Sequence, residues 1–270
     1  MEDGLSDARR ELARVDALLD TEENQITMTT TRVTVAAADL AGALDAVRFA
    51  VGDNPDIPAL SGVQFEVDAS AVRFAATDRY RLAFAELAPS AIDGPAVSVL
   101  VPTSFVDGVR SQLDRDPRID LVLGPDGVEA FAPGWRITAE PIDHDFPNYR
   151  SLVPVATGPG GQRVTVDAAA LRQALAPGSA PTVVREHEGA VHPVAVLAVS
   201  GSGTVRISDE ADWRSAPDRH VAVNREFLLQ ALDAAGGGQL VLDLDGPIRP
   251  LVVRAPADDR FFSLLMPIRY

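Results

Sequence analysis

The stretch RVTVAAADLAGAL, from Arg32 to Leu44, returns as RVTVDAAALRQAL from Arg163 to Leu175, with nine of its thirteen positions identical. A repeat spaced this widely indicates two domains of one fold, because solenoid units recur every ~20 to 50 residues. In each copy an alternating strand pattern runs directly into a helical pattern. The repeat therefore predicts two similar domains in tandem.

The segments that follow each copy also match one another. Alternating apolar and polar residues at 62–78 and at 193–209 predict a β-hairpin in each half, the second closing on a Gly-Ser-Gly turn. Apolar residues at helical spacing in 101–113 and 223–232 predict a second helix in each half. Each half therefore has the order strand, helix, hairpin, helix.

Each half is expected to close on further strands. Residues 119–142 and 239–268 both contain runs of alternating apolar residues, separated by Gly-Pro-Asp-Gly and Asp-Gly-Pro turns. Taken together, the patterns predict an α+β fold made of two tandem domains, each with antiparallel β-sheets and two helices.

Composition sets the outer limits of the interpretation. The chain has 270 residues, of which 46% are hydrophobic, enough for two ordinary globular cores. No apolar run approaches the ~20 residues of a membrane span, and the acidic start lacks the features of a signal peptide. We expect a cytoplasmic protein, and the absence of cysteine excludes disulfides and thiolate metal sites.

The net charge is −15, and all 24 basic residues are arginine. Such a surface repels nucleic acid unless the arginines gather on one face. Most of the acidic residues are expected on the solvated exterior, where they confer solubility.

The N-terminal segment belongs to neither repeat. Its apolar residues fall at a heptad-like spacing and predict an amphipathic helix of about four turns, formed around Leu5, Ala8, Leu12, Val15 and Leu19. Two interpretations stay open: an amphipathic extension, or the end of a dimerisation helix that follows an upstream domain. The predicted divisions are an N-terminal helix and linker at 1–27, a domain at 28–154, a Gly-rich linker at 155–162 and a domain at 163–270.

Three further segments point to a family: ATDRYRLAF at 76–84, FPNYRSLVP at 146–154, and MPIRY at 266–270. In this order, on a duplicated domain, they resemble the bacterial DNA polymerase III β sliding clamp, specifically its middle and C-terminal domains. The family's first domain has no counterpart in the chain.

The resemblance implies an apolar cleft between the two domains, where linear motifs of polymerase, clamp loader or repair proteins would bind. Arg81 and Arg269 would donate to the peptide, and Met266 would supply an adaptable apolar wall. Carried over by motif, the cleft residues are Leu60, Thr77, Tyr80, Arg81, Leu82, Pro147, Leu152, Leu264, Leu265, Met266, Pro267, Ile268 and Arg269.

The chain departs from the family at several of these positions. Tyr80 stands where the family has histidine, and Tyr270 stands where an aliphatic residue is common. The family's helices line a central hole and carry basic residues toward DNA. Here the four predicted helices hold four basic and six acidic residues, so the resemblance implies only a weak DNA-facing set: Arg48, Arg110, Arg172 and Arg225.

The family's ring contains six domains, made from two chains of three. A chain of two domains would close such a ring only as a trimer, so a homo-oligomer is expected, with dimer and trimer both open.

Catalytic chemistry finds little support in the sequence. The clusters Asp143-His144-Asp145 and Glu186-His187-Glu188 with His192 are interpreted as exposed loop charges rather than metal ligands. No nucleophile elbow, Walker loop or dinucleotide fingerprint occurs. We therefore expect a non-catalytic protein without cofactor or metal.

Two functions remain. The first is a sliding-clamp-like processivity or docking factor that binds peptide motifs between its domains, with possible DNA association and no membrane association. The alternative is a clamp-derived effector or dimerisation module of a transcriptional regulator, whose helix-turn-helix head would precede residue 1.

Overall fold

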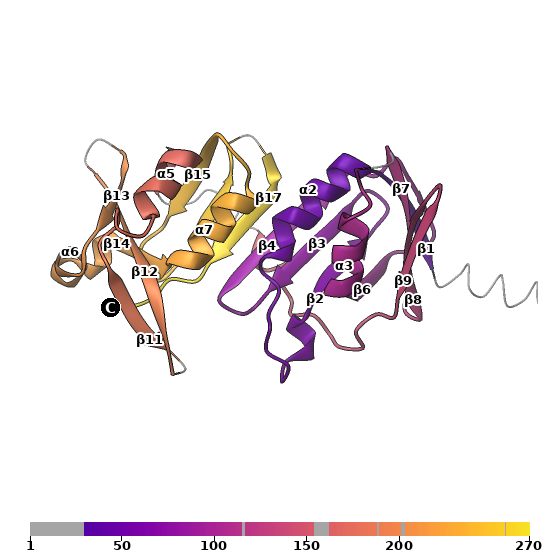
Figure 1. The fold of residues 1–270 in the computed structure, drawn as a ribbon, viewed down its shortest axis with the longest axis horizontal. Helices are drawn as coiled ribbons and strands as arrows, with labels where there is room; N and C mark the ends of the chain where they lie inside the picture. Colours follow the sequence, from indigo (N-terminus) through magenta and orange to yellow (C-terminus); the bar gives the residue numbers. More distant parts are fainter. Residues whose placement is uncertain (1–29, 115–116, 154–161, 188, 201–202, 257) are drawn as a thin grey trace, which may run out of the picture.

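The computed structural model describes residues 30–270, except 115–116, 154–161, 188, 201–202 and 257 (Figure 1). The helix predicted within residues 1–27 and the predicted linker at 155–162, apart from Gln162, lie outside the described residues. Residues 30–153 are called the first unit below, and residues 162–270 the second unit.

The first unit follows the order predicted from the repeat, with three further strands between its predicted hairpin and its second helix. Its elements are β1 Thr31–Ala36, α2 Ala37–Arg48, the 3₁₀ turn η1 Pro58–Leu60, β2 Gly62–Val67, β3 Val72–Thr77, β4 Arg81–Leu87, β5 Ala91–Asp93, β6 Val97–Pro102, α3 Thr103–Arg110, β7 Arg118–Gly124, β8 Gly127–Ala132 and β9 Trp135–Ala139.

The second unit keeps the order strand, helix, hairpin, helix, but it has an additional strand before its hairpin, and between its hairpin and its second helix an unpredicted helix replaces two strands of the first unit. Its elements are β10 Gln162–Asp167, α5 Ala168–Leu175, β11 Val183–His187, β12 Ala190–Val199, β13 Val205–Ser208, α6 Glu210–Ser215, the 3₁₀ turn η2 Pro217–Arg219, β14 His220–Asn224, α7 Arg225–Ala234, β15 Gln239–Leu244, β16 Leu251–Ala255 and β17 Asp258–Leu265. The additional helix is α6. The predicted α+β class, with antiparallel sheets and paired helices, is confirmed.

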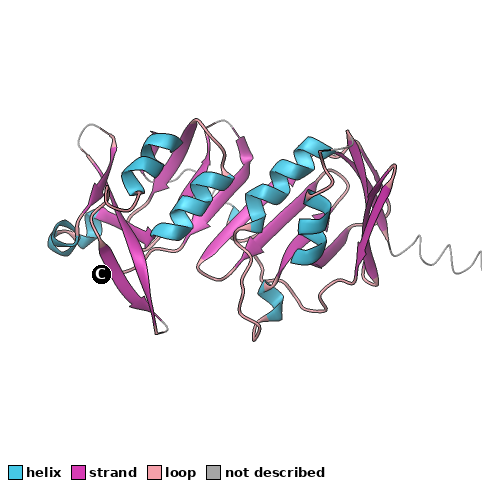
Figure 2. Cartoon of the chain, viewed as in Figure 1, coloured by secondary structure: helices cyan, strands magenta, loops and turns pink. Residues whose placement is uncertain are grey.

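The two units share one continuous sheet. Its eight strands lie in the order β10-β15-β16-β17-β4-β3-β2-β6, so that β17 of the second unit pairs with β4 of the first. The first unit also has the sheet β5-β1-β7-β8-β9, and the second has a smaller sheet in which β11, β13 and β14 all pair with β12. Figure 2 shows α2, α3, α5 and α7 along one side of the shared sheet.

The repeated strand-helix segment forms for the same reason in both copies. In α2 the residues at helical spacing, Leu40, Leu44 and Val47, are fully buried, and α5 buries Leu171 and Leu175 in the same way. Burial of each such side chain contributes about 1.5 to 3 kcal/mol. The copies differ at the start of the helix, because the carboxylate of Asp167 accepts from the Ala170 N–H at 2.8 Å, whereas Ala36 offers no side-chain cap.

Each unit has its own hydrophobic core on the helix side of the sheet. The first core joins α2 and α3 to both sheets around Phe65 and Phe74, whose rings meet edge to face at 4.7 Å. The second core joins α5 and α7 to strands β10 to β17 around Leu197 and Leu228. None of the described helices has the length and apolar composition needed to span a bilayer.

Candidate functional site

The segments singled out in the sequence meet where the two units join. Strand β17 lies antiparallel to β4, with Leu264 opposite Leu82 and Leu265 opposite Arg81. One residue further on, the backbone N–H of Met266 donates to the carbonyl oxygen of Tyr80 at 2.8 Å. The end of the chain is therefore held against the turn that begins β4.

Side chains alternate across this sheet, and the alternation divides the predicted cleft residues between its two faces. Leu82 and Leu264 point away from the helices and are 4% and 2% exposed. They belong to a third core that spans both units, together with Ala75, Phe84, Tyr149, Val252 and Phe262. Leu265 points to the other face, into the core of the second unit. These three leucines pack the junction and offer little surface to a peptide.

Arg81 corrects the sequence interpretation most clearly. Its guanidinium is 9% exposed, and Nε donates to the carboxylate of Asp78 at 2.9 Å. It also donates to the Gln230 side chain of α7, and it stacks on Phe227 at 4.1 Å and on Phe49 at 5.2 Å. Burial lowers the pKa of Arg81, and the charge of Asp78 opposes that effect. Its Nε and Nη1 donors are engaged within the junction and its side chain is buried, so Arg81 joins the units instead of facing a peptide.

The turn before β4 is fixed by its own polar groups. The Thr77 hydroxyl donates to the Arg81 carbonyl at 2.6 Å and accepts from the Arg79 N–H, and Arg79 has a positive φ of 79°. Asp78 Oδ1 accepts from the backbone N–H groups of Tyr80 and Arg81. These bonds hold a conformation that non-glycine residues rarely adopt, and they give Tyr80 a defined position.

Leu60 lies beneath this turn. Its carbonyl accepts from the Gly52 N–H at 2.9 Å, and a Cβ at Gly52 would stand 3.2 Å from the Leu60 Cβ and 3.6 Å from the Asp78 Cα. Because Leu60 is buried, it does not form the open wall that was predicted.

Met266 and Tyr80 remain accessible at the junction. Met266 is 47% exposed, and Tyr80 is partly exposed with its hydroxyl 2.9 Å from Nε2 of His187 on β11. The two rings of this pair meet edge to face at 5.4 Å. We call Tyr80, Met266 and Pro267 the junction surface; the predicted cleft residue Thr77 is buried and holds the turn instead.

The last residues of the chain lie along the second unit. The Ile268 N–H donates to the Ala222 carbonyl of β14 at 2.7 Å, and Ile268 packs against a small core around Trp213. Tyr270 meets Trp213 edge to face at 5.2 Å, and Arg185 lies over both rings. Arg269 is exposed. The sequence analysis missed this cluster, because an isolated tryptophan carries no signal of its partners.

The predicted residues of the FPNYR segment lie over the outer face of the first unit. Pro147 lines a hollow of about 730 Å³ with Leu100 and Ile142, and Leu152 is 38% exposed one turn later. A neighbouring hollow of about 900 Å³ is lined by Glu66, Arg73 and Tyr149 among others. Neither hollow includes Tyr80 or Met266, so the structure does not bring Pro147 together with the junction surface.

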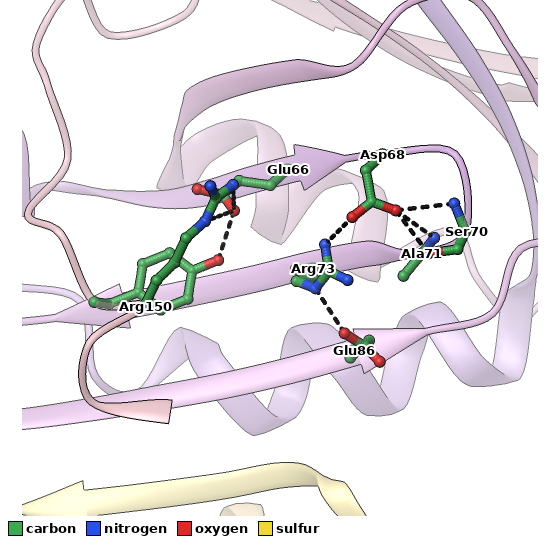
Figure 3. Close-up of polar contacts among 8 residues, drawn as sticks. Glu66, Asp68, Ser70, Ala71, Arg73, Glu86 and Arg150 are labelled. Atoms are coloured by element: carbon green, nitrogen blue, oxygen red, sulfur yellow. Dashed lines mark hydrogen bonds and ion pairs between the residues drawn. The ribbon is translucent and has the colours of Figure 1, made fainter. Parts of the chain in front are cut away.

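Glu66 anchors this segment (Figure 3). Its Oε2 accepts from the Tyr149 hydroxyl at 2.8 Å and from Arg150 at 2.7 Å, while the neighbouring Arg73 bonds Asp68 and Glu86. Burial, and then the hydrogen bond to Glu66, raise the pKa of Tyr149 well above its usual value. These contacts hold the FPNYR segment, which precedes the connection between the two units, against the first unit.

Two of the arginines predicted to face DNA are paired with carboxylates on the helix side of the sheet. Arg48 of α2 forms a bidentate pair with Asp107 of α3, and Arg110 of α3 forms the reciprocal pair with Asp45 of α2. The hydrogen bonds to these carboxylates raise the pKa of both arginines. The positive charge of each is thus offset on the adjacent helix.

The other two arginines are also engaged. Arg172 pairs with Asp233 and donates to backbone carbonyls at the end of α7. Arg225 is buried and donates to the Pro181 carbonyl at 2.7 Å, which corrects its predicted DNA-facing position. Among the described residues, no three histidine, aspartate or glutamate side chains are grouped as metal ligands.

Comparison with known proteins agrees with this geometry. The family profile described as "DNA polymerase III beta subunit, central domain" matches residues 34–148. The beta sliding clamp of Streptomyces coelicolor is 27% identical over 253 residues, which cover 87% of this chain and 66% of that protein. The beta sliding clamp of Bacillus subtilis is 23% identical over 231 residues, which cover 82% and 60%.

Solved structures show the same fold. The DNA polymerase III subunit beta of Pseudomonas aeruginosa aligns with a TM-score of 0.74 at 21% identity, covering 88% of this chain and 66% of that one. A sliding clamp of the same organism bound to griselimycin aligns with a TM-score of 0.72 at 20% identity, covering 88% and 65%. The chain spans about 60 to 66% of the length of these relatives. Residues 34–148 therefore match the central domain of the DNA polymerase III beta subunit family, and over most of its length the chain is similar in sequence and fold to the bacterial beta sliding clamps.

Proposed function

We propose that the chain is a non-catalytic docking protein of the sliding-clamp type, which binds short linear motifs of replication or repair proteins at the junction surface. The observation that carries the proposal is the position of Met266. Its side chain is 47% exposed, although the two preceding leucines are almost fully buried, and its backbone is bonded to Tyr80. A flexible thioether at a fixed place is suited to apolar anchors of several shapes.

Neighbouring groups extend this surface. Tyr80 adds an aromatic face with a polar tip, and beyond the partly exposed Pro267 the chain is bonded to β14 through Ile268. An apolar anchor beside a few polar groups is the usual composition of a peptide-binding hot spot. Griselimycin in the related Pseudomonas aeruginosa structure supports the view that this fold accepts a ligand.

Tight DNA binding is not part of the proposal. The arginines Arg48, Arg110 and Arg172 are paired with carboxylates, and the chain carries a net charge of −15. Few phosphate contacts are available without breaking those pairs, so little counterion release would favour binding. We propose that any DNA association is weak and, because few counterions are released, depends only shallowly on salt concentration.

A labelled peptide with glutamine followed by leucine and phenylalanine tests the docking role by fluorescence polarisation. We expect saturable binding, weakened at least fivefold by Met266→Ala. Ile248→Ala is the matched control, since Ile248 is an exposed aliphatic residue outside the junction surface. Absence of binding at millimolar peptide, or equal losses in both variants, would exclude docking at this surface. The regulator alternative rests on residues 1–27, and no contact in the described part of the chain adds to it.

A further inference from the structure

The two units present different edges to a neighbour. In the first unit the strands lie in the order β4-β3-β2-β6, and β4 receives β17 of the second unit through five opposed residue pairs. In the first unit β2 pairs with β3 and with β6, and in the second unit β12 pairs with β13 and with β14 in the same way. Strand β12 is therefore the counterpart of β2, β13 is the counterpart of β3, and β14 is the counterpart of β6. No described strand lies beyond β13 in the place of β4.

The intervening sequence explains the missing strand. In the first unit residues 78–96 connect β3 to β6 and include both β4 and β5. In the second unit the connection from β13 to β14 is only residues 209–219, and these form α6 and η2. A connection this short, already folded as helix, does not supply a seven-residue strand such as β4.

Side-chain contacts hold α6 in place. Asp209 caps the helix by accepting from the Asp212 N–H at 2.8 Å, and Arg206 of β13 bonds the Asp212 carboxylate at 2.6 Å. Trp213 is 1% exposed, packed among Val194, Val196 and Ala222 and covered by Ile268 of the chain end. Unfolding α6 to make a strand would expose this tryptophan.

The ends of the units confirm which strands correspond. Both β9 and β17 are followed by a Pro-Ile pair, and the isoleucine N–H donates to the strand alongside: Ile142 to Leu100 of β6, and Ile268 to Ala222 of β14. Strand β9 is therefore the counterpart of β17. Figure 1 places β9 and α6 at opposite ends of the molecule. A head-to-tail array built on the internal junction would have to pair β9 of one copy with a strand beyond β13 of the next.

We infer that the outer edge of the second unit is closed to a third unit, so that copies of this chain do not add head to tail and do not close a ring through this edge. The inference rests on the proposed function and restricts it. The junction surface binds its peptide on a single chain, and copies of this chain alone do not form a ring around DNA. The inference does not depend on Tyr80 or Met266, on which the proposed peptide binding rests.

Cysteine cross-linking tests the closed edge, since the chain has no native cysteine. Thr138→Cys on β9 and Thr204→Cys, directly before β13, place exposed thiols at the two edges and leave the Arg206–Asp212 bond intact, and Arg136→Cys with Thr204→Cys samples a second register. Under mild oxidation we expect each double variant to give no more cross-linked chains than its two single variants give. We also expect the unlinked protein to lack a species of three chains by light scattering.

A control comes from the internal junction. Phe261→Cys with Ala85→Cys, which are directly opposed, should form a disulfide within one chain. A ladder of linked chains from either edge pair, or a three-chain mass, would overturn the inference while leaving peptide binding unaffected. Loss of peptide binding with no ladder would instead exclude the proposed function and leave the closed edge standing.

Discussion

The backbone N–H of Met266 donates to the carbonyl oxygen of Tyr80 at 2.8 Å, which ties the end of β17 to the turn that opens β4. Because main-chain atoms make this bond, the position of Met266 does not depend on the Tyr80 side chain. The position of Met266 at the junction is therefore compatible with tyrosine at position 80. The tyrosine hydroxyl instead contacts His187 of the second unit.

Arg81→Ala is expected to loosen the junction. The substitution leaves Asp78 and Gln230 without their shared donor and removes the cation that stacks on Phe227. Breaking a buried charge pair of this kind costs roughly 3 kcal/mol. Urea unfolding should show this loss or a separate early transition for one unit. Arg260→Ala is the control, because its pair with Asp258 is exposed and screened by solvent and should contribute little to stability; equal losses would contradict the assigned role of Arg81.

Tyr149 is expected to make the protein sensitive to alkaline pH. Burial and Glu66 raise its pKa above the usual value of about 10, so the unfolded chain releases this proton at lower pH than the folded one. The contribution is present below pH ~10 and is lost as the pH rises further. Tyr149→Phe should reduce the fall in stability above that pH and remove a late component from the ultraviolet titration of phenolate. An unchanged titration curve would place the Tyr149 hydroxyl outside the burial described.

Freeing the helix-side arginines should increase DNA binding. Asp45→Asn with Asp107→Asn removes the carboxylates that pair with Arg110 and Arg48 and lowers the negative charge by two. Two released guanidinium groups should raise the affinity for duplex DNA by roughly tenfold at low salt. Fluorescence anisotropy at several salt concentrations measures both affinity and slope. Asp258→Asn, away from these helices, is the charge control, and a matching increase there would mean that net charge alone is responsible.

Trp213→Ala should destabilise the second unit. The indole is almost fully buried and supports both Ile268 and Tyr270, so removing it leaves a cavity that costs about 3 to 5 kcal/mol. Thermal unfolding followed by circular dichroism measures the loss, and Trp213→Phe should retain part of the stability. A loss below about 1 kcal/mol for the alanine variant would show that α6 does not pack as described.

The repeated segment alone determined most of the architecture. Identical residues at 32–35 and 163–166 form β1 and β10, and the apolar spacing after them forms α2 and α5, because strand and helix periodicities are local properties. The same patterns predicted the hairpin in each unit. They did not reveal α6, since its formation depends on Trp213 finding a pocket formed by distant strands.

The sequence predicted the candidate site only in part. Sequence order indicated which segments would matter, and pairing of β17 with β4 brought two of them together. Which side chains face outward was decided by the sheet, because adjacent residues of a strand point to opposite faces. Arg81 and Leu82 are neighbours in sequence, yet one stacks on helix α7 and the other packs beneath Tyr149. The pairing of Arg48, Arg110 and Arg172 with acids on adjacent helices likewise depends on helix packing, which only the tertiary structure fixes.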